Sequence, residues 1–141
     1  MSAPNHLQRF DMSVEDIDRL MRAFYAKIRK HDVLGPVFLS AVGSGAEDWK
    51  EHESKIASFW RNAILMDREY SGNPMMVHLM NTDIEFDHFP IWLALFRDTA
   101  FQVLEHDKAT NISDLADRIG RGLSFGIANA RQSINEPPIL R

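Results

Sequence analysis

The stretch Ser71-Gly72-Asn73-Pro74-Met75-Met76-Val77-His78-Leu79-Met80 lies near the middle of the chain and is the best guide to its fold. Its Gly-Asn-Pro turn ends one element and begins another, and Pro74 suits the first turn of a helix, where its missing N–H costs no hydrogen bond. His78 is the only polar side chain between Pro74 and Asn81. We interpret His78 as an inward-facing metal ligand. The alternative is a core histidine hydrogen-bonded to the backbone, which is the more common role of a single histidine on an apolar face.

The composition is that of one globular domain with a sizeable core. The chain has 141 residues, the size of a single domain, and 45% of them are hydrophobic. Nine phenylalanines and seven methionines supply flat or flexible apolar side chains, which pack well against a planar or irregular partner. An ordinary phenylalanine-rich core explains the same composition, so composition alone does not identify a ligand.

Charge and residue usage exclude several classes of function. The net charge is −4 and no basic run occurs, so neither nucleic acid nor an anionic membrane is an expected partner. The absence of cysteine excludes disulfides, thiolate metal sites and cysteine catalysis. Residues 1–10 lack the apolar core of a signal peptide, and the longest apolar run, residues 89–96, is too short to span a bilayer. We therefore expect a cytoplasmic protein that does not enter a membrane.

Hydrophobic periodicity predicts an all-α fold. Apolar residues recur at steps of three and four along four segments, and Ser13 begins the first of them with the pattern of a helix cap. The expected helices cover about residues 13–31, 46–63, 84–105 and 112–132. No alternating strand pattern and no internal repeat is present in the sequence.

The segments outside these helices complete the predicted organisation. Residues 32–44 read as a turn-rich connection with one anchoring aromatic, Phe38, and their glycines match neither a dinucleotide nor a phosphate-loop pattern. Glycines within the last helix indicate close approach of another helix or of a ligand. We expect a single domain over residues 13–132, between a flexible lead-in of residues 1–12 and a disordered tail of residues 133–141.

Polar side chains interrupt the apolar stripes of three expected helices. Tyr25, His52 and Trp92 lie on these stripes, and His78 lies in the apolar run between the second and third helices. Burying such a group without a partner costs about 1–3 kcal/mol, so burying all four suggests a common task. One imidazole as the only strong iron ligand suits a haem with one open axial position.

Six short motifs follow one another in an order that is specific as a set, although each is weak alone. They are Phe24-Tyr25, Leu34-Gly35-Pro36-Val37-Phe38, Trp49-Lys50-Glu51-His52, Phe59-Trp60, Gly72-Asn73-Pro74 with His78, and Trp92-Leu93 with Leu95-Phe96. With this set the chain resembles the group III truncated haemoglobins of bacteria over about residues 13–130. The resemblance implies a truncated globin fold, in which a two-over-two helical sandwich encloses haem b.

The resemblance also implies a role for individual residues. His78 matches the proximal iron ligand of the family, and the residues that match its polar distal pocket are Tyr25, His52 and Trp92. The residues that match positions beside the haem or supporting it are Phe24, Phe38, Ile56, Phe59 and Trp60, with Phe38 packing flat on the porphyrin. Lys55 lies one helical turn after His52 and is expected to reach a haem propionate, the alternative being a solvated lysine.

The implied function is the binding of O2, CO and NO at ferrous haem iron. The alternative is a haem enzyme, a nitric oxide dioxygenase or a peroxidase-like oxidase, which would depend on an external reductase because the chain has no flavin or nicotinamide domain. Three potential donors around the ligand favour tight retention of oxygen or chemistry on it. The physiological ligand, the reductase, the oligomeric state and whether His52 gates the pocket or ligates iron stay open.

Two unrelated helical classes are less compatible with the sequence. A carboxylate-bridged di-iron bundle needs two Glu-x-x-His motifs on separate helices, and the chain has one, Glu85-Phe86-Asp87-His88. An interaction bundle without cofactor leaves the polar residues on the apolar stripes unexplained.

Overall fold

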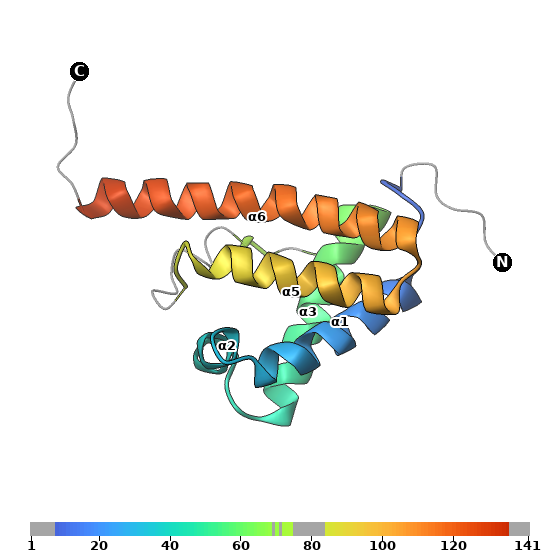
Figure 1. The fold of residues 1–141 in the computed structure, drawn as a ribbon, viewed down its shortest axis with the longest axis horizontal. Coiled ribbons are helices and arrows are strands. Elements are labelled where there is room, and N and C mark those ends of the chain that lie inside the picture. The colour runs from blue at the N-terminus through green and yellow to red at the C-terminus, as the bar shows by residue number, and fades with distance from the viewer. Residues whose placement is uncertain (1–7, 69, 71, 75–83, 136–141) are drawn as a thin grey trace, which may run out of the picture.

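The computed structural model describes residues 8–68, 70, 72–74 and 84–135, with the side chains described as far as residue 131. Over this part of the chain the structure consists of helices and contains no strand, which confirms the all-α prediction (Figure 1). The helices are α1 (Val14–Lys30), α2 (Leu34–Val42), α3 (Ala46–Leu65), α5 (His88–Val103) and α6 (His106–Asn135).

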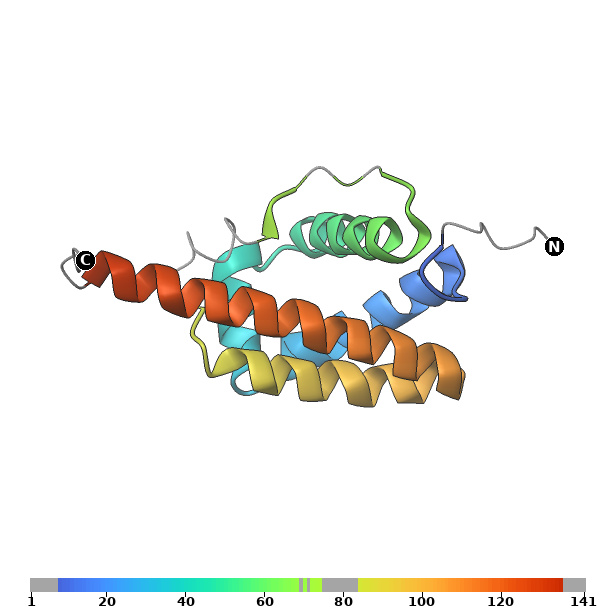
Figure 2. The same ribbon diagram turned by 90° about the horizontal axis from the view of Figure 1, so that it is seen from above.

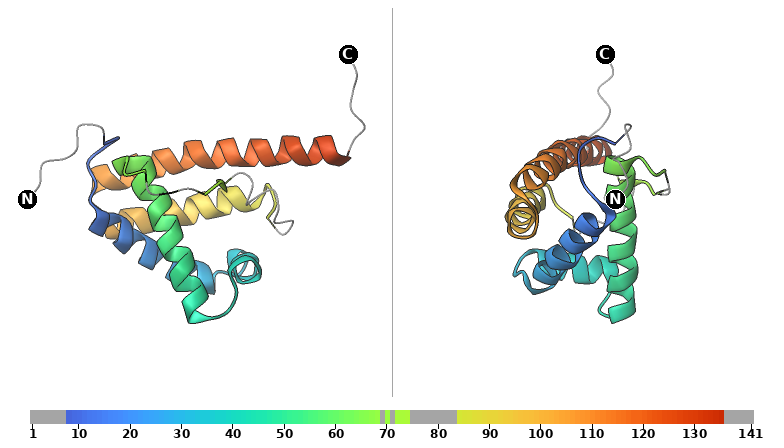
Figure 3. Two further views of the ribbon diagram at one scale, coloured as in Figure 1. Left: turned by 180° about the vertical axis from the view of Figure 1, so that it is seen from behind. Right: turned by 90° about the vertical axis from the view of Figure 1, so that its right-hand side faces the viewer.

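The four long helices of the described part of the chain form two pairs, α1 with α3 and α5 with α6, and one pair lies across the other. Helices α5 and α6 lie side by side and run in opposite directions, and α1 packs against both α3 and α5 (Figures 1 and 2). The short helix α2 lies beside the first half of α3, where it contacts α1, α3 and α5 (Figure 3). This is the two-over-two helical sandwich that the sequence predicted. None of the described helices is long and apolar enough to cross a membrane.

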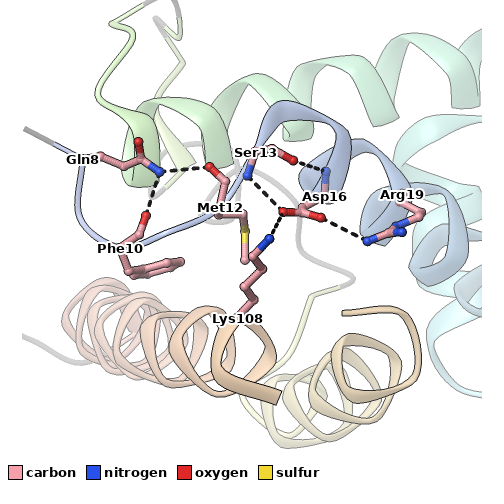
Figure 4. Close-up of polar contacts among 7 residues, drawn as sticks. All are labelled: Gln8, Phe10, Met12, Ser13, Asp16, Arg19 and Lys108. Carbon is pink, nitrogen blue, oxygen red and sulfur yellow. Dashed lines mark hydrogen bonds and ion pairs between the residues drawn. The ribbon is translucent and has the colours of Figure 1, made fainter. Parts of the chain in front are cut away.

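The start of α1 is fixed by a capping box that also reaches α6. The Ser13 hydroxyl accepts the Asp16 N–H, and the Asp16 carboxylate accepts the Ser13 N–H, each at 3.1 Å. The same carboxylate accepts hydrogen bonds from Lys108 at 2.8 Å and from Arg19 at 3.0 Å (Figure 4). Burial opposes ionisation of Asp16, but the bonds from Lys108 and Ser13 outweigh it and hold its pKa below the usual value. The carboxylate therefore joins two helices that lie far apart in the sequence.

Residues at both borders of the expected domain are ordered. Residues 8–12, which we expected to be flexible, pack against the core: Met12 is 3% exposed, and the Arg9 N–H donates to the Ile64 carbonyl at 2.8 Å. The Gln8 side chain donates to the carbonyls of Phe10 and Met12 (Figure 4). Helix α6 continues to Asn135, beyond the expected end at residue 132. The boundaries otherwise stay a prediction, because residues 1–7 and 136–141 lie outside the described residues.

Helix α2 corrects the prediction of a turn-rich connection over residues 32–44. Gly35 and Pro36 punctuate the sequence, but both lie in the first turn of α2, where a proline lacks no hydrogen bond. The His31 Nδ1 caps this turn by accepting the N–H groups of Val33 and Leu34 at 3.1 Å. A Cβ on Gly35 would lie 3.2 Å from the Arg29 carbonyl oxygen, so the glycine allows α2 to start directly against the end of α1.

Two other helices begin at places different from those expected. Helix α5 begins at His88 rather than near residue 84, and Pro90 lies in its first turn. Helix α6 begins at His106 rather than near residue 112. Its first turn is mostly polar and therefore lacks the periodic apolar signal, although Ala109 is fully buried.

An aromatic stack joins three helices at the centre of the core. Phe96 of α5 stacks between Trp60 of α3 and Trp92 of α5, at ring-centroid distances of 5.3 and 5.0 Å. Phe24 of α1 meets Trp92 and Phe96 edge to face. Such pairs add about 0.5–1.5 kcal/mol each beyond the apolar area they bury. Trp92 therefore has a fixed position, which matters because its other side faces a cavity.

Candidate functional site

A cavity of about 250 Å3 opens between α2, α3, α5 and α6, with Tyr25 of α1 at one wall. Its lining is mainly aromatic and aliphatic, as is typical of sites for small molecules and cofactors. The described lining residues are Tyr25, Leu34, Val37, Phe38, Ala41, Val42, His52, Lys55, Ile56, Phe59, Trp60, Tyr70, Pro74, Ile84, His88, Phe89, Trp92, Ala116, Ile119, Gly120 and Leu123.

Most of the residues that the sequence selected lie at this one cavity. Those that line it are Tyr25, Phe38, His52, Lys55, Ile56, Phe59, Trp60 and Trp92. Phe24 is fully buried behind this wall, in contact with Tyr25, Trp92 and Phe96. The selected residues come from four helices, and the apolar stripes that carry them turn toward the same space.

His78 lies outside the described residues, which end at Pro74 on one side of it and resume at Ile84 on the other. Pro74 and Ile84 both line the cavity. The two points between which His78 stands in the sequence are therefore both at the wall of this cavity.

Tyr25 and His52 form the polar part of the wall on the side of α1 and α3. Their rings meet edge to face with centroids 5.1 Å apart, and Tyr25 is only 2% exposed. Burial, together with the charge of Glu53, raises the pKa of Tyr25 well above its usual value, so the hydroxyl stays protonated. No hydrogen bond to this hydroxyl is found among the described residues. Tyr25 is thus a protonated phenol at the wall of the cavity.

The His52 side chain is neutral, and its Nε2 atom has no hydrogen-bond partner in the described part of the chain. Burial, with a further contribution from the charge of Lys55, lowers the pKa of His52 from 6.5 to about 4. Nε2 is buried, and within the described part of the chain it makes no hydrogen bond. Leaving a buried nitrogen unpaired costs about 1–3 kcal/mol, so a molecule in the cavity that hydrogen-bonds to Nε2 would be stabilised there.

The tryptophans near the cavity differ in how their indole N–H groups are used. The Trp49 indole donates to the Gly43 carbonyl at 2.8 Å and is covered by the Arg29 guanidinium, which makes Trp49 a structural residue. Trp92 lines the cavity, and among the described residues its indole N–H has no hydrogen bond. Trp92 and Trp60 both line the cavity without a described hydrogen bond from the indole N–H, and the ring of Trp92 is held by its aromatic neighbours Phe24 and Phe96.

Several lining residues were not selected from the sequence. The α2 residues Leu34, Val37, Ala41 and Val42 share a helix face with the selected Phe38, and this signal was hidden by the glycine and proline beside it. Tyr70 lies in an irregular segment without periodicity, and burial raises its pKa. His88 was noticed in the sequence only as part of an incomplete di-iron motif. Within the described residues no three acidic, histidine or cysteine side chains lie close enough to hold a metal ion.

Comparison with known proteins identifies relatives of this chain in sequence and in structure. The chain is 38% identical to the protein named group 3 truncated hemoglobin ctb of Campylobacter jejuni, over 98 residues that make up 70% of this chain and 76% of the relative. The crystal structure of a group III truncated hemoglobin from Campylobacter jejuni superposes with a TM-score of 0.79 and 32% identity, over 89% of this chain and 95% of the other. No family model matches the chain.

Proposed function

This chain belongs to the group III truncated haemoglobins, and on that premise we propose that its cavity holds haem b and binds O2 and related diatomic ligands. The residues present suit such a group. Aromatic faces of Phe38, Phe59 and Trp92 line the cavity and can pack against a planar macrocycle. The buried His52 Nε2, which has no hydrogen-bond partner among the described residues and lies in a mainly apolar wall, is the observation that carries the proposal.

We assign the iron ligand to His78. It stands in the sequence between Pro74 and Ile84, which both line the cavity, and it matches the proximal iron ligand of the family. Two histidines of the described chain line the cavity, and their surroundings differ from each other. His52 faces Tyr25, and the Nδ1 atom of His88 is engaged by the Glu85 N–H.

When bound, haem supplies a ferrous iron with an open axial position for a diatomic molecule. Tyr25, Trp92 and His52 act on the polar atoms of that molecule. The Tyr25 hydroxyl and the Trp92 indole are rigid donors, because their rings are locked by aromatic neighbours. Each hydrogen bond contributes about 0.5–1.5 kcal/mol, which slows ligand release about threefold to tenfold. Neutral His52 adds an N–H donor without placing a positive charge in the cavity.

Lys55 supplies positive charge at the exposed edge of the cavity. It follows His52 by three residues on α3 and lines the cavity although it is exposed. A long ammonium side chain of this kind keeps its charge in water while its stem covers apolar surface. We assign it to a propionate of the haem.

The test is the absorption spectrum of the purified protein in its oxidised, reduced and CO-bound forms. We expect haem spectra for the wild type and loss of stable haem binding in His78→Ala, because this substitution removes the proposed iron ligand. His106→Ala is the matched control, since the His106 side chain is 81% exposed and lies away from the cavity. A wild-type protein that takes up no haem would refute the function, and normal ferrous–CO spectra in His78→Ala would refute the ligand assignment.

A further inference from the structure

The charged and titratable groups of the cavity indicate what kind of molecule it accepts. Lys55 is the only described lining residue with a full charge, and no aspartate or glutamate is found among the described lining residues. A wall of this composition favours an occupant that carries acidic groups. Haem b carries two propionates, and Lys55 can neutralise one of them. The second propionate can accept a hydrogen bond from another donor at the cavity.

His88 has the features of that second donor. It is the first residue of α5, lines the cavity and is half-buried. Its Nδ1 atom accepts the Glu85 N–H at 3.0 Å, so the neutral ring must carry its proton on Nε2. The neighbouring carboxylates of Glu85 and Asp87 are exposed and therefore screened by water. The backbone bond thus fixes the tautomer and leaves a single N–H donor.

We propose that His88 is a carboxylate-binding residue, which donates from Nε2 to the second propionate while Lys55 of α3 holds the first. This assignment rests on the proposed function. Helix α3 and the beginning of α5 lie apart in the described fold and supply different walls of the cavity, so the two donors approach from different helices (Figure 2). In this arrangement His88 sets the orientation of the macrocycle in its plane.

The competing explanation is that His88 serves only as a cap at the start of α5. Two substitutions of nearly equal size distinguish a role as a helix cap from a role in binding a propionate. His88→Gln keeps an acceptor for the Glu85 N–H and a donor for a carboxylate, whereas His88→Glu keeps the acceptor and replaces the donor by a negative oxygen. The corresponding pair at exposed His106 is the control for adding charge to the protein.

The experiment measures the rate at which haem passes from each variant to an excess of a haem-scavenging apoprotein. It is run with haem b and with its dimethyl ester, in which both propionates are neutral. We expect His88→Glu to lose haem b about tenfold to a hundredfold faster than His88→Gln, because a charge-assisted bond is replaced by repulsion. With the dimethyl ester the two variants should differ by less than about twofold, because no carboxylate remains to distinguish them.

The other outcomes contradict the assignment in distinct ways. If His88→Glu loses both macrocycles faster than His88→Gln, and by the same factor, His88 acts on the fold alone. If the two variants lose each macrocycle at nearly the same rate, His88 does not reach the propionate. If the glutamate variant does not fold, His88→Phe replaces it with the same ester comparison, since phenylalanine removes the donor without adding charge. A wild-type protein that takes up neither macrocycle would refute the proposed function itself and this assignment with it.

Discussion

The neutral state of half-buried His52 makes the stability of this protein depend on pH in a defined window. In the folded chain the pKa of His52 is about 4, against 6.5 for an ordinary histidine. Between these values the unfolded chain binds a proton that the folded chain rejects, so stability falls as the pH is lowered from 6.5 toward 4. Above pH 6.5 the contribution is fully present. The difference between the two pKa values corresponds to about 3 kcal/mol at most, or about 1.4 kcal/mol per pH unit within the window.

The assay compares the wild type with His52→Gln, whose side chain does not titrate. The free energy of unfolding is measured by urea denaturation at several pH values from 7.5 down to the lowest at which both proteins fold. Carboxylates that titrate in the same range affect both proteins equally and cancel in the difference. We expect the difference between the two proteins to shift in favour of His52→Gln by about 1.4 kcal/mol per pH unit below 6.5.

A matched control and a clear refutation are available. His106→Gln changes a histidine whose side chain is 81% exposed, and it is the control for the exchange of histidine for glutamine. Parallel pH profiles for the wild type and His52→Gln would show that His52 is not held neutral. The reasoning about the half-buried imidazole of His52 would then be wrong.

Three further predictions concern the hydrogen-bond donors at the cavity, the Asp16–Lys108 contact between α1 and α6, and the aromatic stack in the core. Tyr25→Phe and Trp92→Phe should each raise the O2 dissociation rate about threefold to tenfold in stopped-flow measurements, and unchanged rates in both would remove them from the ligand site. Asp16→Asn and Lys108→Met should show a coupling energy of about 1–3 kcal/mol in a double-mutant cycle by urea denaturation, because both side chains are largely buried at a 2.8 Å contact. Additive effects would mean that the pair contributes nothing. Phe96→Ala should lower the free energy of unfolding by about 3–5 kcal/mol, since it empties the centre of the aromatic stack, and a loss below about 1 kcal/mol would contradict that packing.

The sequence predicted a helix well where its hydrophobic periodicity is not interrupted by residues typical of turns. Helix α1 has a capping box at Ser13 and an uninterrupted apolar stripe, and it begins and ends within a residue of the expected bounds. The tight approach foreseen for the glycines of α6 occurs at Gly120, where a Cβ would lie 3.1 Å from the Leu93 side chain of α5, but not at Gly122, where a Cβ would meet nothing within 4 Å. Helix α2 could not be predicted in the same way, because Gly35 and Pro36 signal a turn unless their place within the helix is known.

The same limit applies to the candidate site. Tyr25, His52 and Trp92 could be selected because a polar group on an apolar stripe is conspicuous, and the structure brings all three to one cavity. Tyr70 and His88 precede or begin elements, where no periodicity assigns a side chain to the interior. Whether these two side chains reach the cavity depends on the tertiary path of the chain, which local sequence patterns do not determine. The role of His78 stays a prediction, since it lies outside the described residues.

The bond between Asp16 and Lys108 has a consequence for the order of events during synthesis. It joins residues that are 92 positions apart, so the first helix to leave the ribosome must wait for one of its principal partners until most of the chain has been made. A nascent chain that has released only α1, α2 and α3 also lacks the α5 ring of Phe96, against which Phe24 and Trp60 pack. Closing so long a loop carries an entropic cost that local contacts cannot offset in advance. The amino-terminal half of this protein is therefore expected to reach its final arrangement only after the carboxy-terminal helices emerge.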